Sequence, residues 1–98
     1  METDVVHNPD QARYEVWADG KLAGFVQYRP REGALNLFHT EIDGAYDGQG
    51  LGSTLARGAL DDLRAQHLAV VPSCPFIAGY IRRHPEYEDL VSPGESAG

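Results

Sequence analysis

The stretch Ala45-Tyr46-Asp47-Gly48-Gln49-Gly50-Leu51-Gly52-Ser53 joins two segments of different periodicity and decides how the chain folds. Residues before it, up to Ile42, alternate as in a β-strand, and apolar residues after it recur at helical spacing up to Gln66. A glycine-rich turn that opens a helix leaves the first helical N–H groups unpaired, at the positive end of the helix dipole. The stretch therefore predicts a seat for a phosphate or pyrophosphate group.

The residues before this turn predict three strands and a flexible lead-in. Asp19-Gly20 and Pro30–Gly33 supply the turn chemistry that connects successive antiparallel strands. Both ends of the chain, residues 1–11 and 92–98, are mainly polar, and we expect them to be flexible. The expected strands, which show alternating patterns, are residues 13–18, 22–29 and 35–42.

The residues after the turn predict a helix, a strand and a second helix. The apolar run 68–72 follows the first helix and suits a buried strand parallel to the third one. Pro75 is favoured at a first helical position, so Cys74 is the expected N-cap of the second helix. The order β-β-β-α-β-α predicts an α+β fold with a mixed, mostly antiparallel sheet in a single domain, residues 1–98. The expected helices are residues 51–66 and 76–83.

Composition excludes several classes of function. The formal net charge of −7, with eight scattered basic residues, argues against nucleic-acid binding and suits a cationic acceptor. The single cysteine leaves no internal disulfide, and the four histidines lack metal-ligand spacing, so we expect no metal. No apolar run is long enough for a signal or a membrane span. We expect a cytoplasmic monomer or weak homodimer.

Three further segments carry a family resemblance. They are His39-Thr40-Glu41 before the turn, Val71-Pro72-Ser73-Cys74-Pro75-Phe76 after it, and Ile81-Arg82-Arg83-His84-Pro85-Glu86-Tyr87 near the end. Together with Asp47–Gly52, they resemble the compact, single-cysteine branch of the Gcn5-related N-acetyltransferase (GNAT) superfamily. The resemblance covers roughly residues 12–90.

The resemblance implies a minimal GNAT-like fold, in which the parallel strand pair splays around a cofactor cleft. It also implies acetyl-coenzyme A as the acetyl donor, with its pyrophosphate in the glycine turn. Asp47 stands where the superfamily motif has Arg or Gln, and a carboxylate there would repel a pyrophosphate unless it points outward. The cofactor-binding residues that the resemblance implies are Ile42, Gly48, Gln49, Gly50, Leu51, Gly52, Ser53 and Cys74.

Cys74 has three interpretations. At a helix N-cap, the dipole favours the thiolate, which could attack the thioester and pass on the acetyl group. Alternatively, the thiol could protonate the leaving coenzyme A thiolate, a role for which the wider superfamily also suggests Tyr80 or Tyr87. The third interpretation is a small packing residue at the base of the cleft. Arg82 and Arg83 are either cofactor ligands or a solvated helix end.

His39 and Glu41 are the candidate bases. The period of two places both on one strand face with Leu35 and Leu37. A protonated amine is no nucleophile, so direct transfer needs a base to remove a proton. Each residue also has a structural interpretation, as a hydrogen-bonded histidine of the sheet and a solvated carboxylate.

These observations favour an N-acetyltransferase that acetylates an amine, either a protein lysine, a terminal amine or a small amine. The catalytic residues would be Cys74, Glu41 and His39. Two alternatives remain: a non-catalytic module that binds coenzyme A or acyl-coenzyme A, and thioester hydrolysis that depends on Cys74. The bare turn Asp19-Gly20 stands where larger superfamily members have helices that shape the acceptor pocket, which predicts an open acceptor site.

Overall fold

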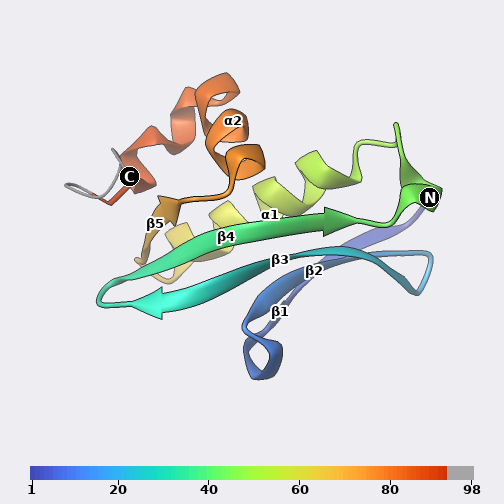
Figure 1. The fold of residues 1–98 in the computed structure, drawn as a ribbon, viewed down its shortest axis with the longest axis horizontal. Coiled ribbons are helices and arrows are strands. Elements are labelled where there is room, and N and C mark those ends of the chain that lie inside the picture. Colours follow the sequence, from blue (N-terminus) through green and yellow to red (C-terminus); the bar gives the residue numbers. More distant parts are fainter. Residues whose placement is uncertain (93–98) are drawn as a thin grey trace.

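The computed structural model describes residues 1–92, which form one five-stranded sheet with strand order β1-β2-β3-β4-β5 (Figure 1). Neighbouring strands are antiparallel except for β4 and β5, which are parallel. The strands are β1 (Thr3–Asn8), β2 (Arg13–Ala18), β3 (Lys21–Arg31), β4 (Ala34–Ile42) and β5 (Ala69–Pro72). The helices are α1 (Leu51–Ala65) and α2 (Pro75–Arg83), with three short 3-10 helices, η1 (Pro9–Gln11), η2 (Gly44–Tyr46) and η3 (Pro85–Leu90).

The predicted α+β class and the parallel strand pair are confirmed. β4, α1 and β5 form the unit of strand, helix and parallel strand that the order of elements predicts. Asp19 and Gly20 both have positive φ, at 50° and 80°, as a two-residue hairpin requires. The second hairpin is tighter than predicted, because β3 continues to Arg31 and only Glu32-Gly33 forms the turn.

The expectation of a flexible lead-in over residues 1–11 is wrong. Thr3–Asn8 forms the edge strand β1, which pairs with all of β2 from Thr3↔Ala18 to Asn8↔Arg13. The side chain of Asn8 then caps η1 by accepting from the Gln11 N–H at 3.2 Å. The polar composition hides the strand, because only one face of β1 is covered. Of the other expected flexible end, residues 93–98 lie outside the described part of the chain.

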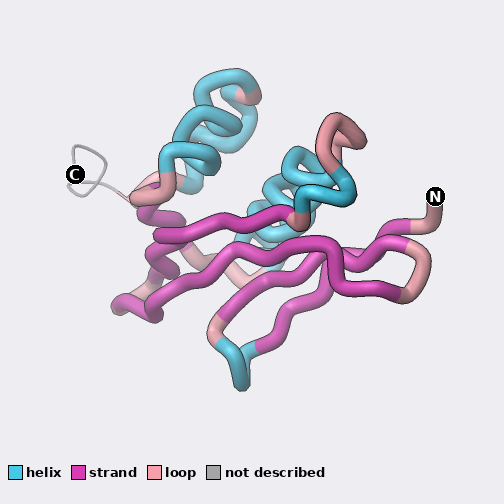
Figure 2. Tube along the Cα trace, turned by 45° about the vertical axis from the view of Figure 1, so that its right-hand side comes forward, coloured by secondary structure: helices cyan, strands magenta, loops and turns pink. Residues whose placement is uncertain are grey.

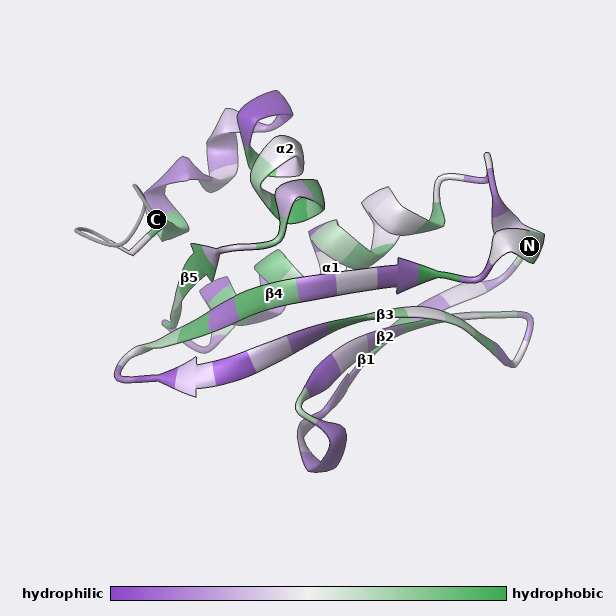
Figure 3. Cartoon of the chain, in the orientation of Figure 1, coloured by the Kyte–Doolittle hydropathy of each residue, from purple (hydrophilic) through white to green (hydrophobic). Residues whose placement is uncertain are grey.

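Among the described residues, helices cover one face of the sheet and leave the other open. Figure 2 shows α1 and α2 on the same side of the sheet, and the buried residues of both helices belong to one hydrophobic cluster with the sheet. Figure 3 shows hydrophobic residues along β5 and parts of β4 and α1, whereas the end of α2 is hydrophilic. We call the uncovered side the open face; it carries Arg13, Glu15, Trp17, Phe25, Gln27, His39 and Glu41.

A β-bulge changes which residues of β4 lie on the open face. Gln27 pairs with His39, but the next residue of β3, Tyr28, pairs with Leu37, so Phe38 is the extra residue. Leu37 is fully buried, whereas His39 and Glu41 are exposed. The prediction that these three side chains share a face is therefore wrong. The extra residue shifts the alternation and turns Thr40 and Ile42, instead, toward the helices.

The open face holds a buried carboxylate. Glu15 is 4% exposed, and its carboxylate accepts hydrogen bonds from Asn8 Nδ2 at 2.9 Å, Arg13 Nε at 2.8 Å and Trp17 Nε1 at 2.9 Å. Burial alone would raise the pKa of Glu15, but these hydrogen bonds and the charge of Arg13 lower it overall. The network ties β1 to β2 without a helix above it.

None of the helices in residues 1–92 has both the length and the hydropathy needed to cross a membrane.

The contact between β1 and α1 is testable at Gly58. A Cβ atom at position 58 would lie 2.7 Å from Val5 Cβ and 2.8 Å from both methyl groups. We expect Gly58→Val to lower the free energy of unfolding by about 1–3 kcal/mol, because the added side chain must push β1 away. Urea unfolding measures this loss. The control Arg57→Val, at an exposed helical position, should cost less than about 0.7 kcal/mol; equal losses would contradict the packing of β1.

The Glu15 network predicts a pH dependence of stability. Because the folded pKa lies below the ordinary value of 4.5, ionised Glu15 stabilises the fold above that pH, and the contribution is lost as pH falls through the folded pKa. Glu15→Gln should therefore lower the free energy of unfolding at pH 7 by about 1–3 kcal/mol. It should also flatten the loss of stability below pH 4.5. Denaturant titrations at several pH values, with exposed Glu32→Gln as the control, check both effects.

Candidate active site

The glycine turn adopts the geometry of an anion seat. Gly48 and Gly50 have positive φ, at 78° and 74°, a region that favours glycine. Gly50 is the N-cap of α1 and provides no side chain to cap it. Within residues 1–92, the N–H groups of Leu51, Gly52 and Ser53 have no backbone acceptor. They stand at the positive end of a 15-residue helix, so this end of α1 can bind an anion.

Two residues of the turn differ from the expected arrangement. The Gln49 N–H donates to the Tyr46 carbonyl at 3.2 Å, so it is already paired. Gly52 lies beneath the ring of Phe76, whose Cζ would be 2.7 Å from a Cβ atom at position 52. Gly52 thus admits an aromatic ring from α2, in addition to any role toward a ligand. Phe76 is 37% exposed, so this ring also forms part of the surface beside the turn.

β4 and β5 part after four residue pairs, from Ala34↔Ala69 to Leu37↔Pro72. Pro72 has no N–H to continue the ladder, and the chain turns away into α2. The Cys74 N–H still donates to the Leu37 carbonyl at 2.9 Å, which holds the start of α2 at the point of parting. Cys74 is the N-cap of α2, as the sequence predicts. Its Sγ atom lies 3.2 Å from Thr40 Oγ1 and is buried.

His39 and Glu41 form a pair on the open face. His39 Nε2 lies 2.9 Å from Glu41 Oε2, and the two side chains are 47% and 61% exposed. The tilted ring of Phe25 lies beside His39, with 6.4 Å between ring centroids. Successive residues of a strand point to opposite faces, so Cys74, which contacts Thr40, lies on the other side of β4 from Glu41. The structure therefore does not gather Cys74, His39 and Glu41 into one cluster.

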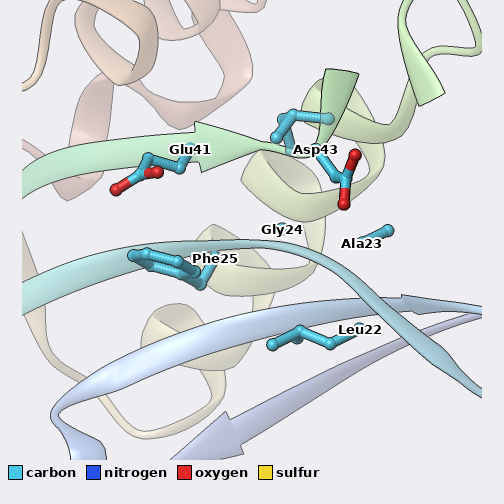
Figure 4. Close-up of a pocket in the computed structure, with 7 residues that line it drawn as sticks. Leu22, Ala23, Gly24, Phe25, Glu41 and Asp43 are labelled. Atoms are coloured by element: carbon cyan, nitrogen blue, oxygen red, sulfur yellow. The ribbon is translucent and has the colours of Figure 1, made fainter. Parts of the chain in front are cut away.

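A recess of about 210 Å³ lies where β3 and β4 run side by side toward the end of β4 (Figure 4). Figure 4 shows the carboxylates of Glu41 and Asp43 on one side and the side chains of Leu22 and Phe25 on the other. Gly24 keeps the strands close here, because a Cβ atom at position 24 would lie 2.5 Å from the Glu41 carbonyl oxygen. The lining residues are Leu22, Ala23, Gly24, Phe25, Glu41, Ile42 and Asp43.

The tyrosines and arginines near the C-terminus have structural contacts. Burial raises the pKa of Tyr80, which stacks on His84 at 4.0 Å. Burial and the hydrogen bond to Asp61 raise the pKa of Tyr87 to about 12, and its hydroxyl donates to that carboxylate at 2.7 Å. Both changes make a tyrosine a weaker acid. Arg82 and Arg83 are exposed in the last turn of α2, at the opposite end of that helix from Cys74.

Sequence reasoning missed Thr40, Phe76 and Asp43 as site residues. Thr40 was missed because the bulge that turns it toward Cys74 is not marked by any residue type in the sequence. Phe76 ends one of the quoted motif segments and Asp43 follows another by two residues, but their neighbours across the fold are set by tertiary contacts alone. Among residues 1–92, no group of three or more His, Cys, Asp and Glu side chains is arranged to hold a metal ion.

Comparison with known proteins now assigns the family. A family model described as GCN5-related N-acetyl-transferase matches residues 13–90, and the chain therefore belongs to this family. The solution structure of a GCN5-like protein from Staphylococcus aureus superposes with a TM-score of 0.69, over 91% of this chain and 87% of that one. Its sequence identity is 19%, so this likeness concerns the fold.

Curated relatives match a part of the chain. Protein NATD1 of Mus musculus is 33% identical over 61 residues, which is 60% of this chain and 56% of that protein. Protein NATD1 of Homo sapiens is also 33% identical over 61 residues, and 54% of it is covered. The chain from Gallus gallus is 35% identical over the same length. The match thus spans just over half the length of these relatives.

Asp47 provides a test of the anion seat. Its Oδ2 atom lies near Gly44, about 4.0 Å from where a Cβ atom of that residue would be, and Asp47 is exposed. The carboxylate therefore points back toward η2. We expect Asp47→Arg to bind acetyl-coenzyme A as tightly as the unchanged protein or up to about tenfold more tightly, because a cation replaces an anion near the phosphates.

Isothermal titration calorimetry measures this effect. Glu32→Arg makes the same change of charge in the β3–β4 turn, at the other end of the hairpin from the recess. An equal gain in both variants would show a general effect of net charge instead. Clearly weaker binding by Asp47→Arg would contradict the outward orientation of Asp47.

Proposed function

We propose that this protein transfers an acetyl group from acetyl-coenzyme A to an amine. The observation that carries the proposal is the parting of β4 and β5 after Leu37 and Pro72. Thr40 and Cys74 lie on the helix side of the gap, and the His39–Glu41 pair lies on the open face. A thioester in the gap would thus have a thiol on one side and a carboxylate on the other.

The donor would be held by backbone groups. The unpaired N–H groups of Leu51, Gly52 and Ser53 suit the pyrophosphate of coenzyme A. Beyond Leu37, no strand of residues 1–92 pairs with β4 on its β5 side, so its N–H and C=O groups can pair with the amides of the pantetheine arm. Ile42, half-buried at the end of β4, adds an apolar contact near the turn.

The acceptor would approach over the open face. Glu41, directly or through a water molecule, takes a proton from the ammonium group, and the freed amine attacks the thioester carbonyl carbon. The new C–N bond forms as the C–S bond breaks, and the leaving thiolate takes a proton. His39 orients the carboxylate through the 2.9 Å contact. Holding both reactants in this geometry supplies most of the rate.

Direct transfer suits the surroundings of Cys74 better than an acetyl-cysteine intermediate. A nucleophilic thiol needs a neighbouring base, and the hydroxyl of Thr40 at 3.2 Å is not one. In the described residues, no histidine or carboxylate is hydrogen-bonded to this thiol. The thiol is, however, placed where it could donate its proton to the leaving thiolate, and Thr40 could then stabilise the Cys74 thiolate. Cys74 is accordingly proposed as the acid.

The test is acetyl transfer to a panel of amines, measured as acetyl-amine product and free coenzyme A. We expect Glu41→Gln to lower kcat/KM by about 10²–10⁴-fold at pH 7 and to change the shape of the pH–rate profile, because the base that takes the proton is gone. Glu32→Gln, exposed and remote from the gap, should leave both unchanged. An unshifted profile with intact rate would remove Glu41 from the mechanism.

The same assay separates the rival functions. Binding of coenzyme A without transfer to any amine would indicate a binding module. Release of coenzyme A without an acceptor, abolished in Cys74→Ala, would indicate hydrolysis. Mass spectrometry of the protein after incubation with acetyl-coenzyme A reports on the route, because an acetyl group on Cys74 would overturn direct transfer. No thermal shift with coenzyme A would refute the proposal as a whole.

A further inference from the structure

We propose that the recess between β3 and β4 binds a second cationic nitrogen of the acceptor, so that the preferred acceptor is a diamine, a polyamine or a lysine beside another basic residue. The inference rests on the proposed function, because it takes Glu41 as the residue that meets the reacting amine. It assigns Asp43 and Phe25 as the residues that select the acceptor. A diamine, a polyamine and a lysine beside another basic residue all carry a pair of cationic nitrogens.

The spacing of the two carboxylates sets the spacing of the two cations. Asp43 follows Glu41 by two residues, and its N–H donates to the Ala23 carbonyl at 2.7 Å, which extends the β3–β4 ladder past the end of β4. The Cα atoms of residues two apart in an extended chain are about 7 Å apart. Figure 4 shows Glu41 and Asp43 on the same side of the recess, with their carboxylates pointing toward its opposite ends. A nitrogen held at Glu41 for reaction therefore leaves a second nitrogen, an alkyl chain away, within reach of Asp43.

The carboxylate of Asp43 can accept from a ligand through its second oxygen atom. Its Oδ1 atom accepts from the Ala45 N–H at 2.9 Å and caps η2, which fixes the side chain. The residue is exposed, so an incoming cation need not displace a buried partner. A carboxylate that is oriented by a cap loses less conformational entropy on binding than a mobile one.

The rest of the lining suits a cation with an alkyl chain. The seven lining residues include two carboxylates and no basic side chain. Leu22 and Phe25 provide apolar surface for methylene groups, and an aromatic ring attracts cations. Arg13 lies over the Phe25 ring at 4.7 Å, but its charge is matched by Glu15 at 2.8 Å. The recess therefore keeps a negative balance, in line with the net charge of −7.

The experiment compares a diamine with a monoamine of equal chain length as acceptors. We expect a higher kcat/KM for the diamine than for the monoamine, mainly through a lower KM. The ratio of the two kcat/KM values should fall about tenfold in Asp43→Asn, because a charge-assisted contact is lost. Asparagine keeps the cap on η2, so the fold is preserved. Glu32→Gln should leave the ratio unchanged. The ratio should also shrink as salt concentration rises, since the recess is open to solvent.

Two peptide acceptors distinguish the sources of the second cation. A lysyl peptide with a neighbouring lysine, compared with the same peptide carrying alanine there, tests a protein acceptor against the free polyamine spermidine. The kind of acceptor whose kcat/KM falls more in Asp43→Asn identifies the source of the second cation. Equal ratios in the unchanged protein and in Asp43→Asn, for both kinds of acceptor, would overturn the inference while leaving acetyl transfer intact.

A binding measurement keeps the inference separate from catalysis. Titration of spermidine into the protein without coenzyme A, followed by NMR shifts of Gly24, Phe25 and Asp43, should show saturable binding that Asp43→Asn weakens. Absence of transfer to every amine would refute the proposed function, and Asp43-dependent spermidine binding would then still support the recess. Absence of such binding, together with transfer that does not distinguish monoamines from diamines, would refute the recess alone.

Discussion

The hydrogen bond from the Cys74 N–H to the Leu37 carbonyl is the contact on which the site depends. It occurs where Pro72 ends the parallel ladder, and it holds the chain against β4 for one more contact before α2 begins. Because of it, the two strands part at a fixed point instead of fraying. The same contact places the first turn of α2 beside the first turn of α1, so that Phe76 meets Gly52.

The bulge at Phe38 gives β4 two functions. Before it, Leu35 and Leu37 pack beneath the helices; after it, the alternation is shifted by one residue. Without the shift, His39 and Glu41 would face the core, where a carboxylate without a partner is costly. With it, the polar pair reaches solvent and Thr40 reaches Cys74. One extra residue thus separates the two sides of the gap chemically.

The sequence predicts the elements well where periodicity is strong, and poorly where only one face is covered. The pattern from Leu51 onward, together with Pro75, locates both helices and the N-cap at Cys74 correctly. The strand β1 escapes prediction because its covered side chains include the polar His7, which stacks on Tyr14 at 4.4 Å. The bulge escapes because it depends on register between strands, a property of the pair and not of either sequence. The glycines and the change of periodicity locate the turn, and the family resemblance suggests its ligand. The separation of Cys74 from Glu41 depends on the bulge and so could not be predicted.

The contact of Phe76 with Gly52 makes the residues at these two positions interdependent across relatives of this fold. The ring of Phe76 leaves no room for a Cβ atom at position 52. A protein that carries alanine or a larger residue in the turn must then reduce, rotate or remove its counterpart of this ring. Substitutions at the two positions should therefore be correlated in evolution, although they lie on different helices and far apart in the chain.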